Sequence, residues 1–327
     1  MAKNFMHKKT SAMETGNNSI FQKTFMVWIC ALACTALWGS AFPCIKIGYR
    51  LFAIGSSDTA SQLLFAGIRF FGAGILALLM GSAGQKKILL PHRNSIHRIL
   101  ILCLFQTVLQ YLLFYISMAH ITGVKGSILQ GTSVLFSLLI VCLIFRTEKL
   151  TALKTIGCVI GFLGVIVINF TGGGLNLDFS LSGEGFMILA SLSSSFSAAF
   201  LKQFSRYENP VVLSGYQFLV GGAILAIVGY ACGGRLSGFT PVSIVLLLYM
   251  AFISAAAYSL WGILLKYNPV SRITVFMCMT QIFGVAFSAL FLRETDALGW
   301  QTVAALVLVC AGIVMVNRKT LSSGKTD

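Results

Sequence analysis

Long apolar runs separated by short turn-rich segments constrain this chain more than any other feature of its sequence. A helix needs about 20 apolar residues to cross the roughly 30 Å hydrocarbon core of a bilayer, and runs of that length recur along the 327 residues. They lack the alternating pattern of membrane β-strands, so we predict an all-α integral membrane protein. The predicted spans are 25–49, 61–82, 97–118, 122–145, 151–170, 184–204, 211–232, 241–264, 270–292 and 298–317.

The charged residues indicate how the chain is oriented. They make up only 10% of the sequence, against about 25% in soluble domains. The net charge of +15 raises the question of nucleic-acid binding, but the basic residues concentrate in alternate loops. With the N-terminus in the cytoplasm, the outer side carries only Lys46, Arg50, Lys125, Arg235 and Arg293. The positive-inside rule then places both termini in the cytoplasm. We therefore expect a multi-pass protein of the inner (plasma) membrane, in contact with the lipid bilayer and not with nucleic acid.

The second half of the chain repeats the first. Glu148 corresponds to Glu294, and the segment 164–169 corresponds to 312–317. Each copy holds five predicted spans, and because five is odd the second copy must lie upside down relative to the first. Inverted repeats are typical of secondary transporters, whose substrate sites lie between the repeats. The predicted organisation is a cytoplasmic polar tail (1–24), a first repeat (25–170), a Gly-rich external linker (171–183), a second repeat (184–318) and a cytoplasmic tail (319–327).

Several motifs, in this order and with this duplication, resemble the EamA branch of the drug/metabolite transporter superfamily. The first span ends in WGSAFPCIK (38–46), the second carries Arg69-Phe70, and the fourth leads into EKLT (148–151) before a Gly-rich span. The resemblance implies ten helices in two inverted five-helix halves around a central cavity, with the fifth and tenth helices supporting it from behind. It also implies alternating-access transport of metabolites such as amino acids or drugs, in the direction of export. Val134, Thr280 and 193–195 depart from residues common in that family, so its substrates do not carry over directly.

Catalytic and metal-binding signatures are missing from the sequence. All nine carboxylates fall in tails or at predicted span ends, and the nine cysteines and four histidines show no ligand spacing. The cysteines, mostly within apolar runs, are interpreted as small buried side chains. We therefore predict that the chain is not an enzyme and uses no cofactor or metal.

Arg69 is the strongest candidate for a substrate-binding residue. It lies about 12 Å into the second span at 1.5 Å per residue, where a charge is costly and usually faces the protein interior or a wet cavity. It would then attract an anionic group such as a carboxylate. The alternative is that its long side chain reaches the outer surface or bonds to helix-end carbonyls, and the sequence leaves both open.

Other polar and aromatic residues within the spans complete the predicted site. Such a set suits amphipathic organic solutes better than bare inorganic ions, although contacts between helices would explain each member equally well. Lys46 and Lys202 occupy equivalent positions near opposite ends, while Glu148 and Glu294 are expected to cap the next helix or to pair with neighbouring basic residues. The remaining candidates are Trp38, Ser40, Gln106, Gln110, Tyr111, Tyr115, Gln217, Tyr258, Trp261 and Gln281.

The hypothesis that follows is a secondary transporter or facilitator of small organic metabolites. The alternative is a membrane sensor or scaffold without transport activity, which would call for a soluble domain that the sequence does not offer. A lipid-modifying enzyme is disfavoured by the lack of a catalytic set. Homodimer formation is left open.

Overall fold

The computed structural model describes residues 21, 23–146, 149–169, 179–268 and 273–317, and this part of the chain is helical without any strand. The first half contains α2 (Thr24–Leu51), α3 (Thr59–Gln85), η2 (Arg93–Ser95), α4 (Ile96–Leu102), η3 (Cys103–Leu109), α5 (Gln110–His120), α6 (Gly123–Gln130), α7 (Thr132–Leu139), η4 (Ile140–Ile144) and α8 (Ala152–Ile168). The second half contains η5 (Leu181–Gly185), α9 (Phe186–Phe204), α10 (Pro210–Ala231), α11 (Pro241–Tyr267), α13 (Met277–Leu292), η6 (Thr295–Ala297) and α14 (Trp300–Asn317).

These elements reproduce the predicted spans. Among the described residues, eight continuous helical stretches are long and apolar enough to cross a bilayer, and α8 and α13 are shorter apolar helices. Consecutive elements such as α4, η3 and α5 join into one such stretch, Arg93–His120. The protein is therefore an all-α, multi-pass membrane protein. Below, the termini end is the end of the bundle where α2 begins and α14 ends, and the far end is the opposite one.

Local sequence signals set where several helices begin. The Asp58 carboxylate accepts a hydrogen bond from the Ser61 N–H at 3.0 Å and so caps α3. Asn209 and Thr240 cap α10 and α11, and a proline follows each of them at the first helical position. A polar cap satisfies a free N–H, and proline has no N–H to leave unsatisfied.

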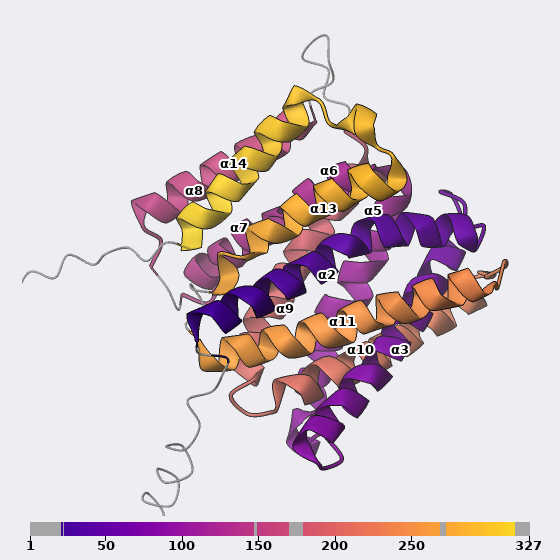
Figure 1. The fold of residues 1–327 in the computed structure, drawn as a ribbon. Coiled ribbons are helices and arrows are strands. Elements are labelled where there is room, and N and C mark those ends of the chain that lie inside the picture. Colours follow the sequence, from indigo (N-terminus) through magenta and orange to yellow (C-terminus); the bar gives the residue numbers. More distant parts are fainter. Residues whose placement is uncertain (1–20, 22, 147–148, 170–178, 269–272, 318–327) are drawn as a thin grey trace, which may run out of the picture.

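Equivalent helices of the two halves each pack against the opposite half (Figure 1). The first helix of the first half, α2, packs against α11 and α13 of the second half. Its counterpart in the second half, α9, packs against α5 and α7 of the first. This reciprocal packing is what an inverted repeat produces, and it places α2 and α9 at the seam between the halves.

Helices α3 and α10 form the most extensive contact between two helices in the described chain. Glycines at intervals of seven residues occupy equivalent positions on both, at 67, 74 and 81 and at 215, 222 and 229. A methyl group built on Gly222 would lie 2.2 Å from the backbone nitrogen of Phe71, and one on Gly67 would lie 2.2 Å from that of Ala226. The two backbones therefore touch, which only small residues permit.

Helices α8 and α14 pack together as a second pair at one side of the bundle (Figure 1). A methyl group on Gly312 would lie 2.7 Å from both the Gly157 carbonyl oxygen and the Gly161 Cα. The glycines at 157, 161 and 164 on α8 therefore form a close contact with α14. Elsewhere the outward faces carry large apolar side chains, such as Leu79, Leu248 and Leu290, which are more than half exposed, as a lipid-facing surface requires.

Candidate functional site

A cavity of about 2010 Å³ lies between the two halves. Helices α2, α5 and α13 run from the termini end toward the far end, and their lining residues nearest the far end are Phe42, Phe114 and Gln281. Helices α3 and α11 run in the opposite direction, and their lining residues nearest the far end are Arg69 and Ser254. No described residue beyond these positions lines the cavity, whereas Phe21, Val316 and Asn317 do so at the termini end. The cavity therefore opens at the termini end and stops near the middle of the bundle.

Arg69 lies at the closed end of this cavity. It is ten residues into α3, or about 15 Å along the helix, and its side chain is only 3% exposed. Nε donates to the Met250 carbonyl oxygen at 3.1 Å, Nη1 to the Tyr115 hydroxyl at 2.6 Å and Nη2 to Ser254 Oγ at 3.2 Å. The side chain thus stays in the interior, so it does not reach for the membrane surface.

Aromatic side chains form the walls around Arg69. The Tyr111 ring stacks on Phe70 with centroids 3.8 Å apart, and its hydroxyl lies 3.0 Å from that of Tyr258. Tyr258 and Trp261 each pack edge-on against Trp38, at 5.3 and 5.2 Å between centroids. Edge-to-face packing fixes ring orientation and adds stability beyond area burial. The result is a rigid aromatic surface with hydroxyl groups at its edge.

Amide side chains give the cavity unsatisfied polar atoms. The Oε1 atoms of Gln106, Gln110 and Gln281 are buried, and none has a hydrogen-bond partner among the described residues. The same holds for Trp38 Nε1 and Thr280 Oγ1. A buried polar atom without a partner costs about 1–3 kcal/mol, so each of these atoms would be stabilised by a hydrogen-bond donor brought into the cavity.

The structure separates the predicted site residues into two groups. Those lining the cavity are Arg69, Trp38, Gln106, Gln110, Tyr111, Tyr258, Trp261 and Gln281. Three others do not line it. Ser40 bonds to the Leu37 carbonyl and the Tyr249 hydroxyl, Tyr115 holds Arg69 from behind, and Gln217 accepts a bond from Thr107. The part that the lining residues play in binding stays a prediction.

Sequence reasoning missed several lining residues. Ser254 lies one helical turn before Tyr258 and two before Trp261, so the spacing 254, 258, 261 places all three on one face of α11. That spacing was a usable signal. Phe42 and Phe114 line the closed end as well, but nothing in the sequence separates them from phenylalanines that face lipid.

The mouth of the cavity is basic. Lys149, Lys154, Lys202 and Arg206 line it at the termini end. Lys202 therefore lies at the mouth, while its counterpart Lys46 lies toward the far end and does not line the cavity. Glu148 lies outside the described residues.

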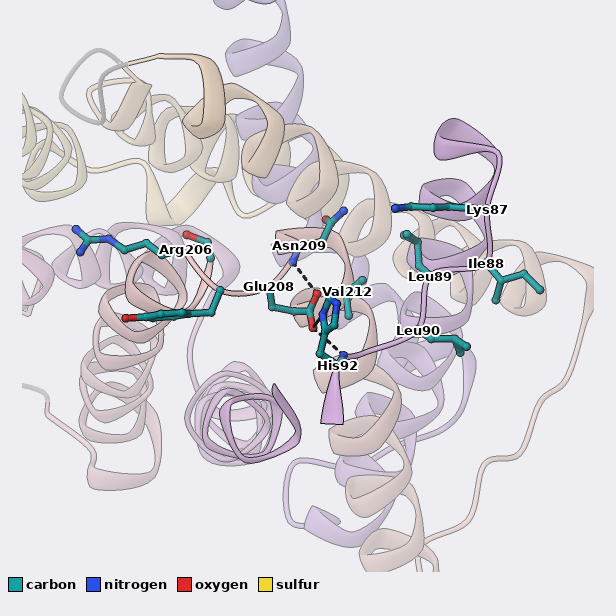
Figure 2. Close-up of a pocket in the computed structure, with 11 residues that line it drawn as sticks. Lys87, Ile88, Leu89, Leu90, His92, Arg206, Glu208, Asn209 and Val212 are labelled. Atoms are coloured by element: carbon teal, nitrogen blue, oxygen red, sulfur yellow. Dashed lines mark hydrogen bonds and ion pairs between the residues drawn. The ribbon is translucent and has the colours of Figure 1, made fainter. Parts of the chain in front are cut away.

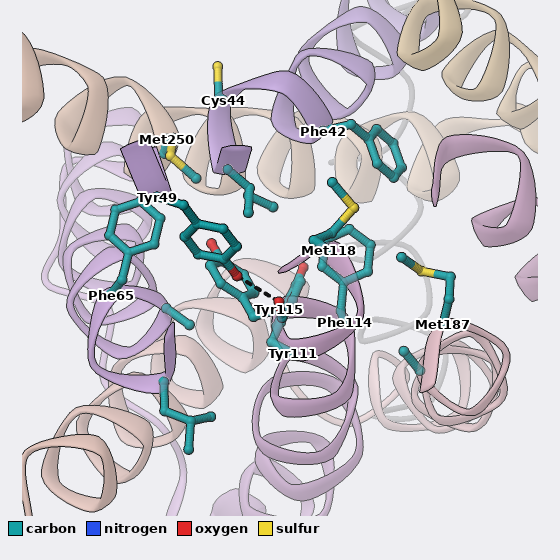
Figure 3. Close-up of a cluster of buried hydrophobic side chains, with 14 of the residues drawn as sticks. Phe42, Cys44, Tyr49, Phe65, Tyr111, Phe114, Tyr115, Met118, Met187 and Met250 are labelled. Atoms are coloured by element: carbon teal, nitrogen blue, oxygen red, sulfur yellow. Dashed lines mark hydrogen bonds between the residues drawn. The ribbon is translucent and has the colours of Figure 1, made fainter. Parts of the chain in front are cut away.

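Large buried side chains, mostly aromatic, close the bundle beyond Arg69. Tyr49, Phe65, Tyr115 and Met118 converge there from α2, α3 and α5 (Figure 3). The Tyr49 hydroxyl donates a 2.6 Å hydrogen bond to the Tyr115 carbonyl oxygen. This plug separates the cavity from the far end.

Polar contacts between the halves reinforce the closure at the far end. Glu294 accepts hydrogen bonds from the backbone N–H groups of Gly123 and Val124, both at 3.1 Å. Glu294 thus caps α6, which belongs to the other half. The prediction that it caps the helix that follows it in the sequence was wrong. Lys125 forms an ion pair with Glu184. Each contact joins a residue of one half to a residue of the other.

A smaller pocket of about 460 Å³ at the termini end is built on the loops next to α4 and α10 (Figure 2). Glu208, 7% exposed, accepts hydrogen bonds from the His92 N–H and Nδ1 and from the Asn209 N–H, at 2.8 to 2.9 Å. Burial alone would raise the pKa of Glu208, but these bonds outweigh it and lower the pKa to about 2. The carboxylate therefore holds the two loops together and is not available as a proton carrier near neutral pH.

Two inverted helical halves that enclose a cavity open at one end define a membrane transporter by architecture. The model of the EamA-like transporter family matches residues 26–170 and 181–318. The chain therefore belongs to that family, with one match to each half.

Comparisons with individual proteins agree. The uncharacterized transporter YvbV of Bacillus subtilis is 23% identical over 287 residues, which cover 87% of this chain and 89% of that protein. The uncharacterized inner membrane transporter YedA of Escherichia coli is 24% identical over 88% of each chain, and a chloroplastic WAT1-related protein of Arabidopsis thaliana is 23% identical over 90% of this chain and 70% of its own length. A solved crystal structure aligns with a TM-score of 0.62 at 13% identity over 88% of this chain and 95% of that one, so it shares the fold.

Proposed function

We propose that this protein is a secondary transporter that exports small organic metabolites, such as amino acids, drugs or related solutes, by alternating access. The observation that carries the proposal is the cavity itself. It reaches the middle of the bundle, opens at the termini end and is closed at the far end by contacts between the two halves. A solute held at its closed end has one route of access in this conformation.

The orientation belongs to the same proposal. The excess of Lys and Arg at the termini end supports a cytoplasmic location for that end under the positive-inside rule, with the protein in an inner (plasma) membrane. The cavity then loads from the cytoplasm, which is the direction needed for export. Because the halves are inverted copies, breaking the far-end contacts and forming equivalent ones at the termini end would expose the same site to the outside.

Transport is tested with the purified full chain in proteoliposomes. Radiolabelled solutes from a broad metabolite panel are loaded, and protein-dependent movement down their gradients is measured. We expect saturable movement of at least one amphipathic solute above protein-free vesicles. A folded, monodisperse protein that moves nothing across the panel would contradict the proposal and favour a sensor or scaffold.

Alternating access is tested by locking the far end. In a background with Cys232→Ser, which removes the exposed cysteine, Lys125→Cys and Glu184→Cys are joined by a short reducible cross-linker. The link spans the two halves, so we expect it to stop transport until it is reduced. Each single cysteine variant, treated with a monofunctional reagent of the same size, is the matched control. Unimpaired transport in the cross-linked protein would rule out opening at this seam.

A further inference from the structure

Arg69 is a buried charge without a compensating acid. Its three hydrogen bonds go to a carbonyl oxygen and two hydroxyl oxygens, all uncharged. No carboxylate pairs with it among the described residues. A guanidinium has five N–H donors, so two remain after these bonds. A charge at this depth is expensive unless a partner or water accompanies it, which makes an anionic ligand the natural partner.

The charged side chains that line the cavity are nearly all positive. Besides Arg69, its lining includes Lys149, Lys154, Lys202 and Arg206. Glu208 is the sole carboxylate among the described lining residues, and His92 and Asn209 already engage it. A cleft lined by one sign of charge focuses its field and concentrates ions of opposite sign. It would repel an organic cation along its full length.

The walls indicate what the anion carries besides its charge. Trp38, Tyr111, Tyr258 and Trp261 offer aromatic faces. The unpaired Oε1 atoms of Gln106, Gln110 and Gln281 are acceptors that need donors. A ligand that satisfies both has a flat or apolar body with N–H or O–H groups and an oxyanion directed at Arg69.

We propose that the transported substrates are organic anions with one carboxylate or similar oxyanion, and that each carries its negative charge across the membrane. This inference rests on the proposed transport function and names its substrate class. The described helices offer no paired acid that could carry a compensating proton, so the charge of the substrate crosses uncompensated. A membrane potential negative on the cytoplasmic side then favours outward movement of a monoanion by about 50-fold per 100 mV. Export would need no coupling ion.

Binding is tested with three probes that share one body. Phenylacetate, phenylacetamide and phenethylamine are negative, neutral and positive at pH 7, and each is added at millimolar concentration to the purified chain while its melting temperature is measured. We expect the anion to raise the melting temperature most. Arg69→Gln should abolish that preference and Arg69→Lys should keep part of it. Arg50→Gln, at an exposed position outside the cavity, is the matched control and should behave like the parent protein.

Charge movement is tested with p-aminohippurate, an aromatic anion that does not cross lipid, against the pyridinium cation 1-methylnicotinamide. A potassium gradient and valinomycin set the potential of the proteoliposome lumen. We expect p-aminohippurate entry to rise several-fold when the lumen is positive and to fall when it is negative, with Arg69→Gln abolishing it. The cation 1-methylnicotinamide should not enter.

The outcomes separate the two proposals. If no solute in either probe set or in the metabolite panel moves, the transport function itself fails. If cations or neutral solutes move while anions do not, transport stands and the anion assignment is overturned. Anion entry that ignores the potential would overturn the uncompensated charge movement.

Discussion

The glycine contact between α3 and α10 makes a sharp prediction about stability. In Gly222→Ala the new methyl group would lie 2.2 Å from the Phe71 backbone nitrogen and 2.8 Å from the Phe70 carbonyl carbon. Contacts below 3.0 Å do not occur for real Cβ atoms, and backbone atoms cannot rotate away as a side chain can. The helices must separate locally by at least 0.8 Å, the difference between 3.0 and 2.2 Å.

The magnitude follows from that separation. A gap of 0.5–1 Å forfeits a quarter to a half of the dispersion energy of each atom pair, and this is the most extensive helix contact in the described chain. We expect a loss of about 3 kcal/mol, the upper end of the range for overpacking. Gly72→Ala is the matched control on α3, because its methyl group would meet Ala251 Cβ at an ordinary 3.5 Å. That change should be neutral or stabilise by about 0.5–1 kcal/mol, since glycine weakens a helix interior.

The assay is size-exclusion chromatography of a fluorescent fusion in detergent after heating across a temperature series. We expect the apparent melting temperature of Gly222→Ala to fall by several degrees, and that of Gly72→Ala to stay level or rise. Equal melting temperatures for the two variants would refute the reasoning, because it depends on backbone contact at one site and open space at the other.

Three further outcomes are expected. Glu208→Gln removes charge-assisted hydrogen bonds and should cost about 1.5–3 kcal/mol at neutral pH. Because the pKa of Glu208 is lowered from 4.5 to about 2, its contribution to stability is complete above pH 4.5 and is lost as the pH falls toward 2. The melting temperatures of parent and variant should therefore converge in acid. A constant difference between them would contradict this. Glu294→Gln weakens the cap on α6 by about 1–2 kcal/mol and so weakens the closure at the far end. Maleimide labelling of buried Cys44 should then become about ten-fold faster. Cys158 is the control, and its labelling rate should not change. Gln281→Leu replaces an unpaired buried amide, so the melting temperature should hold or rise while transport falls; unaltered transport would remove Gln281 from the site.

The number of spans and their inverted arrangement were predictable from sequence because both follow from one-dimensional properties. The length of an apolar run decides whether it can cross the bilayer, and an odd number of spans in each copy decides that the copies oppose each other. Arg69 was recognisable from sequence as a candidate for a similar reason, since few positions in a long apolar helix tolerate a charge. Only the structure showed that its side chain stays in the interior.

The tertiary structure alone decided which face each polar residue presents. Lipid and protein interior are equally apolar, so a spanning helix has no strong polar side that fixes its rotation about its axis. Gln217 and Gln281 are therefore alike in sequence, yet one bonds to Thr107 and the other lines the cavity. The partners of Glu294 could not be predicted from sequence either, because Gly123 and Val124 lie in the other half of the chain. The sequence by itself determined the number of helices and their inverted arrangement. Packing between the halves decided where the cavity lies and which end of it is closed.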